Sequence, residues 1–163
     1  RRAPERVIRL ALIGTNPLSD TPQEAADREP RIIGAKSGRL EAMLDSEVLP
    51  RHVGRGPRRA EAIAQMQEMA MSLGADVFAR QERAMQRRCD QQGTLRRITQ
   101  ATLILAGSED QIVPLKRQEF LAELIPYAKL GVLEGVGHMA MLEDPEGTTE
   151  ALYAWMRQPL VLR

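Results

Sequence analysis

Cysteine and histidine are both scarce in this sequence, and each shortage excludes a class of structure. Cys89 is the only cysteine in 163 residues, so no disulfide can form within the chain, and we expect a reducing, cytoplasmic compartment. The histidines are His52 and His138, with no H-E-x-x-H pattern and no cysteine cluster near either of them. We therefore expect no bound metal.

Long apolar runs, nucleotide-binding motifs and an excess of one charge are also missing. No run approaches the roughly 20 apolar residues of a membrane span, so no membrane association is expected. Nothing resembles G-x-G-x-x-G or a P-loop, which argues against a nucleotide cofactor. Lys and Arg total 23 against 22 for Asp and Glu, and this balance gives no reason to expect nucleic acid as a partner.

Hydrophobic residues make up 43% of the chain, enough for a sizeable core in a single domain. The first structured block is Arg6–Ile13 (RVIRLALI), a short apolar run that ends at a Gly-Thr-Asn-Pro turn. This pattern is typical of a strand buried on both faces. Downstream, Asp20 or Thr21 is a suitable N-cap for a helix, with Pro22 in its first turn.

The second block, residues 31–92, has helical periodicity with polar interruptions. Pro50 should end the first of its helices, because proline removes a backbone donor and restricts the residue before it. Gly74 should separate the last two. From this pattern we expect helices over Leu40–Val48, Ala60–Leu73 and Val77–Arg88.

The third block alternates between strand and helix patterns. The expected elements in chain order are a strand over Ala101–Ala106, a helix over Lys116–Ile125, a strand over Leu130–Leu133 and a helix over Pro145–Met156. Such alternation predicts βαβ units with a parallel sheet, and therefore an α/β fold. We find no internal repeat.

Two loops that follow buried strands carry the residues best suited to chemistry. Asp110 lies in a loop that begins at Gly107 and ends at Pro114, and His138 follows two glycines after the next strand. In open α/β sheets, functional groups gather beyond the carboxyl ends of the strands. One helix and one strand separate the two residues, so both can lie at the same sheet edge. A carboxylate fixes the tautomer of an imidazole and stabilises the imidazolium, which suits the pair to general-base catalysis.

The sequence from 101 to 156 resembles the C-terminal signature of the α/β-hydrolase superfamily. ATLILAGSEDQIVP matches a strand that leads into G-x-x-D-x-x-x-P. LAELIPYAKLGVLEGVGHMAMLEDPE matches a helix ending in I-P, a strand leading into G-x-G-H, and an E-x-P-E segment that opens the last helix. The resemblance implies the C-terminal part of an α/β-hydrolase fold, with a short parallel sheet, flanking helices and a helical cap.

By this resemblance, residues 1–30 and 93–163 form the hydrolase core, and residues 31–92 form the helical cap or lid. Asp110 is then the acid and His138 the base of a Ser-His-Asp triad that cleaves carboxylic esters or lactones, with no cofactor. The expected substrate is small and mostly apolar.

The nucleophile of the triad is absent from this sequence. In the family it lies in a G-x-S-x-G elbow ahead of the acid, and no such motif surrounds any serine of this chain, whose serines are Ser19, Ser37, Ser46, Ser72 and Ser108. We therefore expect the chain to be a fragment, inactive by itself. The strand at Arg6–Ile13 would have an unpaired edge, which we expect to pair with the missing N-terminal half or with a second copy in a homo-oligomer.

Four methionines are predicted to contact substrate, since flexible thioethers adapt to varied apolar shapes. Two lie beside the candidate histidine and two on the strongest predicted cap helix: Met139, Met141, Met66 and Met69.

Several other readings remain open. C–C bond hydrolases, epoxide hydrolases, dehalogenases and cofactor-free peroxidases share the fold and differ mainly in the nucleophile. A non-catalytic binding protein on a hydrolase scaffold is another class. A helical bundle with an incidental Asp and His is the third, and a parallel sheet that brings Asp110 within hydrogen-bond reach of His138 would eliminate it.

Overall fold

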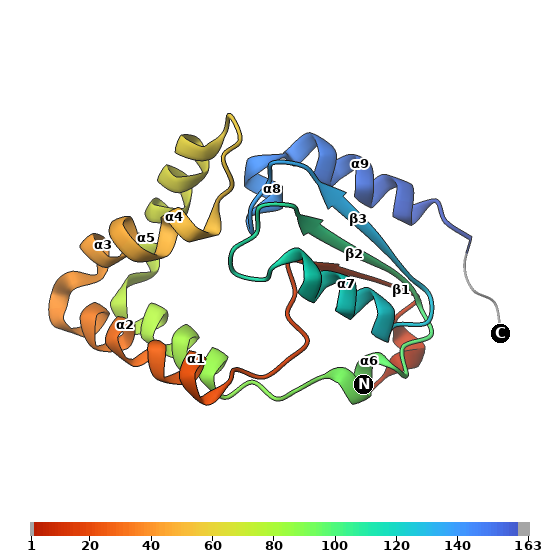
Figure 1. Cartoon of the computed structure of the whole chain (residues 1–163), viewed down its shortest axis with the longest axis horizontal. Helices are drawn as coiled ribbons and strands as arrows, with labels where there is room; N and C mark the ends of the chain where they lie inside the picture. Colours follow the sequence, from red (N-terminus) through yellow and green to blue (C-terminus); the bar gives the residue numbers. More distant parts are fainter. Residues whose placement is uncertain (1, 160–163) are drawn as a thin grey trace.

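The computed structural model describes residues 2–159, which form a parallel sheet between helices and a block of helices beside it (Figure 1). The sheet has the order β1-β2-β3, with all pairings parallel. Its strands are β1 (Arg9–Ile13), β2 (Ala101–Gly107) and β3 (Ala128–Leu133). The predicted α/β class with a short parallel sheet is confirmed, and the helical-bundle alternative is eliminated.

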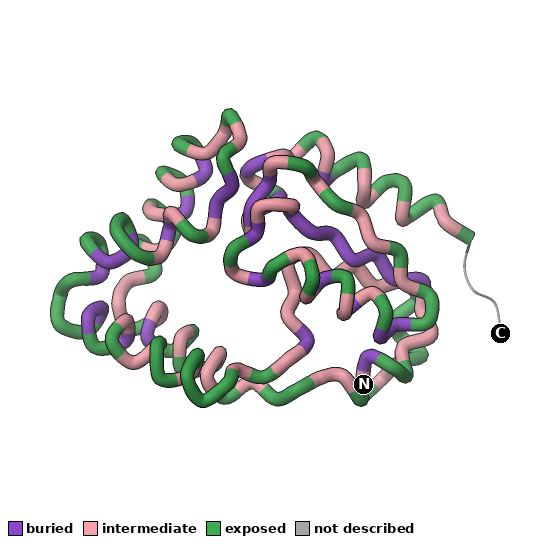
Figure 2. Tube along the Cα trace, viewed as in Figure 1, coloured by how far each residue is buried: buried purple, intermediate pink, exposed green. Residues whose placement is uncertain are grey.

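The central strand β2 is buried along its whole length, as Figure 2 shows in purple. Its neighbours β1 and β3 satisfy its backbone on both edges. Helices α7 (Leu115–Leu124) and α9 (Pro145–Met156) both pack on it, from opposite sides of the sheet in Figure 1. Because both faces and both edges are covered, the strand is apolar almost throughout rather than alternating.

The predicted bounds of the last helix agree with the structure at both ends. Asp144 caps α9 by accepting a hydrogen bond from the Gly147 N–H at 2.9 Å, and Pro145 occupies the first helical position. Both signals are local in the sequence, which is why the start of this helix was predictable.

The remaining elements are short, apart from one long helix. In chain order they are a 3-10 turn (Pro4–Arg6), α1 (Pro22–Asp27), α2 (Glu29–Gly34), a π-type turn (Ala35–Arg39), α3 (Leu40–Met43), a second π-type turn (Leu44–Val48), α4 (Leu49–His52), α5 (Arg59–Gln86), α6 (Gln92–Leu95) and α8 (Ala140–Glu143). None of the helices in the described part of the chain combines the length and apolar character needed to cross a membrane.

Two of the three predicted boundary signals behave as expected. Thr21 is the N-cap of α1, where it forms a reciprocal capping box with Glu24. Gly74 interrupts α5 with φ +79°, so the long helix is two helical stretches that meet at a kink. The expected stop at Pro50 is wrong, because Pro50 lies in the first turn of α4, where the missing N–H costs no helical hydrogen bond.

Residues 22–86 form a helical segment with its own apolar core. Leu44 and Leu49 are almost completely buried there, and Met66 of α5 packs in the same cluster. The packed helices begin at Pro22, ahead of residue 31, and the division into a core and a cap stays a prediction.

The helical segment is held at its two ends by one buried carboxylate. Asp20, just ahead of α1, has a side chain only 2% exposed. It accepts hydrogen bonds from Arg28 Nε at 2.6 Å and from Arg88 Nη2 at 2.9 Å. Since Arg28 lies in the first helices and Arg88 follows the last, this carboxylate fastens the beginning of the segment to its end.

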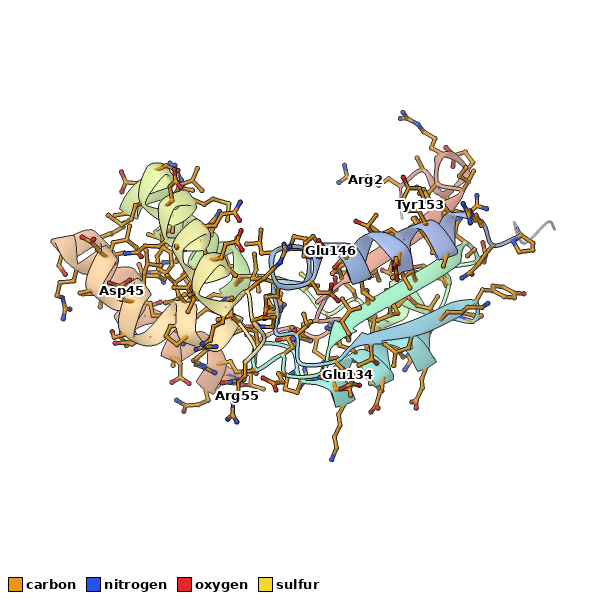
Figure 3. All side chains as sticks on the ribbon, turned by 90° about the horizontal axis from the view of Figure 1, so that it is seen from above. Arg2, Asp45, Arg55, Glu134, Glu146 and Tyr153 are labelled. Atoms are coloured by element: carbon orange, nitrogen blue, oxygen red, sulfur yellow. The ribbon has the colours of Figure 1, made fainter. Side chains whose placement is uncertain are left out.

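Seen from above, the helical segment and the sheet lie side by side, with Arg55 and Glu134 near the junction (Figure 3). The Arg55 N–H donates to Glu109 Oε2 at 2.8 Å across it. Within residues 2–159, β1 pairs with β2 alone, so its second edge has no partner strand there.

Candidate active site

Asp110 lies in the loop after β2, where the strand ends and α7 has not yet begun. Its side chain is fully buried, and its two oxygens have different partners. Oδ1 accepts backbone hydrogen bonds from Ile112 at 2.8 Å and Val113 at 2.9 Å. Oδ2 is 2.8 Å from His138 Nδ1. The two backbone donors fix the carboxylate so that its second oxygen faces the imidazole.

His138 lies beyond the carboxyl end of β3, after a turn that requires Gly135 at φ +73°. Its side chain is 23% exposed, so the ring is anchored by Asp110 and still reaches open space. The ring packs against Gly14 at the end of β1, where an added Cβ would lie 3.1 Å from Cε1 and Nδ1. All three strands therefore contribute to one site at the same edge of the sheet, as expected for an open α/β sheet.

A second buried carboxylate supports the loop that carries the histidine. Glu143 is 7% exposed and accepts three backbone hydrogen bonds. Oε2 accepts from Gly54 at 2.6 Å and Gly137 at 2.9 Å, and Oε1 accepts from Met139 at 3.0 Å. Gly137 and Met139 flank His138, so Glu143 fixes the backbone on both sides of that residue.

The helical segment contacts the loop that carries His138 (the histidine loop) through backbone atoms on both sides. The His138 N–H donates to the His52 carbonyl at 2.8 Å. Gly54 and Gly137 pass so closely that a Cβ on either would collide with the backbone of the other. This contact places the side chain of His52 beside that of His138, with ring centroids 5.6 Å apart and planes at 75°.

A cavity of about 380 Å³ opens between the helical segment and the sheet. His138 and Ile112 line it from the sheet side, and the helical segment contributes apolar walls at Val48, Phe78 and Met85. Charged side chains also reach it: Glu24, Asp27, Arg28, Arg31, Glu47, Arg51 and Glu82. The cavity is thus more polar than a pocket for a purely apolar substrate.

None of the four methionines predicted to contact substrate lines this cavity. Met66 is buried in the core of the helical segment, and Met139 packs against the same cluster. Met69 and Met141 are more than two-fifths exposed. Met66 thus serves helix packing, Met69 faces solvent, and Phe78 and Met85 supply the cavity wall instead.

Sequence reasoning missed the supporting residues Gly14, His52 and Glu143. His52 was recognisable only as the second of two histidines, and Glu143 only as the glutamate of the E-x-P-E segment. Their partners lie far along the chain, so no local spacing indicated them. Within residues 2–159, no group of three or more His, Cys, Asp or Glu side chains is placed to hold a metal ion.

Comparisons with known proteins show which proteins this chain resembles. No protein-family model matches the chain. A pimeloyl-[acyl-carrier protein] methyl ester esterase of Aromatoleum aromaticum is 28% identical over 90% of this chain and 63% of its own length. A proposed carbamate hydrolase, RutD, of Pseudomonas savastanoi pv. phaseolicola is 38% identical over 44% of this chain and 27% of its own length.

Among solved structures, a thermophilic esterase from Thermogutta terrifontis superposes with a TM-score of 0.88 and 26% sequence identity. The match covers 96% of this chain and 58% of the esterase. The chain thus spans less than two thirds of each of these proteins, and it corresponds to the C-terminal part of the esterase fold.

Proposed function

Because the chain belongs to the α/β-hydrolase superfamily, we propose that Asp110 and His138 are the acid and base of a site that hydrolyses small carboxylic esters or lactones. The observation that carries this proposal is the 2.8 Å hydrogen bond between the Asp110 carboxylate and Nδ1 of His138, a residue that lines a cavity. The resemblance to two esterases supports the ester as substrate class.

The geometry prepares His138 to accept a proton at Nε2. A carboxylate only accepts hydrogen bonds, so Nδ1 carries the hydrogen and Nε2 carries the lone pair. His138 takes the proton of an attacking hydroxyl through Nε2, and Asp110 stabilises the imidazolium that forms. The two backbone N–H groups on Asp110 Oδ1 keep the carboxylate oriented during this step.

The hydroxyl comes from a serine that this sequence does not contain in an elbow motif. We propose that a longer protein, or a companion chain, supplies the elbow and the strands that pair with the second edge of β1. A second copy of the chain at this edge is the alternative partner. This chain alone is then inactive, because an acid and a base without a nucleophile give no covalent intermediate.

The type of residue at the nucleophile elbow would also distinguish between the other activities found in the superfamily. A serine at the elbow would support ester, lactone or C–C bond hydrolysis, or a cofactor-free peroxidase. The similarity to a proposed carbamate hydrolase adds carbamates to this group. An aspartate there would indicate an epoxide hydrolase or a dehalogenase. An intact triad with negligible turnover would indicate a binding protein.

The direct test is labelling with a fluorophosphonate, which reacts with activated serines, followed by intact-mass measurement. We expect the longer protein or complex to be labelled on a serine outside this sequence, and the chain alone to remain unlabelled. A label on one of the five serines of this chain would overturn the assignment of the missing nucleophile.

The matched variant is Asp110→Asn, which keeps the shape of the side chain but presents the wrong hydrogen-bonding group to Nδ1. In the longer protein that contains the nucleophile, we expect kcat for ester hydrolysis to fall by about 10³–10⁴-fold, as for loss of a triad carboxylate elsewhere. An unchanged kcat in a folded variant would remove Asp110 from the mechanism.

A further inference from the structure

The second histidine of the chain stands beside the first, in a position that the proposed triad does not use. His52 ends α4 in the helical segment and lines the same cavity as His138. The two rings meet edge to face at 5.6 Å, and the His52 carbonyl accepts the His138 N–H at 2.8 Å. This backbone bond fixes the relative position of the two rings.

Of the two ring nitrogens of His52, Nδ1 has a hydrogen-bond partner within the protein and Nε2 has none among the described residues. Nδ1 lies 2.7 Å from the Val48 carbonyl, which can only accept a hydrogen bond, so Nδ1 carries the hydrogen. In the neutral ring Nε2 is therefore an acceptor. It makes no hydrogen bond to any residue in the range 2–159 that the structure describes.

The surroundings keep this ring neutral. Burial is the main cause that lowers the pKa of His52, and electrostatic interactions with His138 and Arg31 act in the same direction. The Val48 carbonyl and Asp110 act in the opposite direction without reversing the result. At neutral pH, His52 thus presents a lone pair and not a positive charge.

The cavity is therefore lined by two imidazoles that are held in the same way. Each has Nδ1 held by a fixed acceptor, the Asp110 carboxylate for His138 and the Val48 carbonyl for His52. His138 Nε2 is assigned to the nucleophile, which leaves the acceptor on His52 without a role. Because His52 lines the cavity, this acceptor is accessible to a molecule that binds there.

We propose that His52 Nε2 accepts a hydrogen bond from a hydroxyl or N–H group of the bound substrate, so that the site selects esters that carry such a donor near the scissile bond. This inference rests on the proposed ester hydrolysis and names its substrate class. A substrate with a polar group also fits the charged lining of the cavity better than a purely apolar one. A site built to bond a donor rejects the analogue that lacks it, because its own polar group is then left unpaired.

The test compares methyl butanoate with its 2-, 3- and 4-hydroxy derivatives on the longer protein that contains the nucleophile. We expect at least one hydroxy ester to have a kcat/KM about 10–100-fold above that of methyl butanoate, corresponding to one hydrogen bond. His52→Phe keeps a flat ring without an acceptor and should abolish this preference. His52→Gln can place an amide oxygen near the position of Nε2 and should retain most of it.

If His52 has a purely structural role, His52→Phe should lower kcat/KM for all four esters by the same factor. This result would overturn the proposal. So would the absence of any hydroxy ester with a preference that depends on His52. Failure to hydrolyse any of the esters would instead refute the proposed function, and a second measurement then decides the present inference.

That measurement is ¹⁵N NMR of the histidine rings, which needs no turnover. We expect His52 to be in the Nδ1–H tautomer. Its Nε2 resonance should shift when the ethyl ketone analogue of the preferred hydroxy ester is added. If no ester is turned over, the three hydroxy ketones are added in turn, and at least one of them should cause this shift. The ketone without the hydroxyl should leave the resonance unchanged. An Nε2–H tautomer, or an equal response to both kinds of ketone, would overturn the proposal.

Discussion

Replacement of Glu143 by glutamine tests whether this carboxylate holds the histidine loop. The carboxylate accepts from Gly54 and Gly137 through Oε2 and from Met139 through Oε1. A glutamine amide has one oxygen, so its NH₂ group must face at least one of these backbone donors. The substitution nearly keeps the volume of the side chain, removes its charge and replaces one acceptor with a donor.

The magnitude follows from the bonds that are lost. A hydrogen bond to a charged group contributes about 1.5–3 kcal/mol, and a buried donor left without an acceptor costs about 1–3 kcal/mol. Together they predict a loss of about 3–5 kcal/mol in the free energy of unfolding. Both Glu143 and its partners are in the seam between the helical segment and the sheet, so little water is available to compensate.

The assay is urea denaturation of the wild-type protein and the variant, with the m-values compared to ensure that the same transition is measured. Glu146→Gln is the matched control, since Glu146 is a nearby glutamate with a side chain 70% exposed (Figure 3) and a single ion pair to Arg58. That control should change the stability by no more than about 0.5 kcal/mol. Equal effects of the two substitutions would refute the role given to Glu143.

Three further predictions concern the site and its supports. In the longer protein, Gly14→Ala should reduce kcat by about 10–100-fold by displacing His138. Gly38→Ala is the control, because Gly38 has a positive φ as well but no neighbour within 4 Å, so kcat should not change. Equal kcat values for the two variants would refute the role of the Gly14 contact. Asp20→Asn should lower the free energy of unfolding by about 2–4 kcal/mol, below the full cost of breaking a buried pair because its two arginine partners are 16% and 23% exposed. Thermal denaturation measures this loss, and a change below about 0.5 kcal/mol would contradict it. Because the pKa of His52 is lowered on folding, the unfolded chain binds more protons below about pH 6.5, so stability should decrease as the pH falls through this window. His52→Gln should lack that part of the decrease, and identical pH profiles from urea titrations would count against the neutral ring.

The parts of the fold that were predictable from sequence are those specified by local chemistry. A capping residue followed by proline marks the start of α9, and a positive φ that favours glycine marks the kink at Gly74. The apolar run of β2 reflects cover on both faces. Pro50 misled the prediction because proline is equally suited to stopping one helix and starting the next, and the π-type turn before α4 has no sequence pattern of its own.

The acid and the histidine of the site were predictable because each follows a strand, with glycines where the chain turns. Their supports were not, because they depend on contacts across the whole chain. Glu143 is 89 positions from Gly54 in the sequence. Gly14 precedes the whole helical segment in the sequence, whereas the His138 ring that it contacts follows this segment. No spacing rule connects such residues before the fold is known.

The place of β1 in the chain has a consequence for the order of folding. Its hydrogen-bonding partner β2 begins only at Ala101, after the whole helical segment, whereas β2, α7 and β3 are neighbours in sequence. Closing the longer loop costs more chain entropy, so β1 should join a sheet that β2 and β3 have already started. During synthesis at about 5–20 residues per second, β1 emerges several seconds before β2. Pulsed hydrogen exchange during refolding should then find the amides of β1 protected after those of β2 and β3.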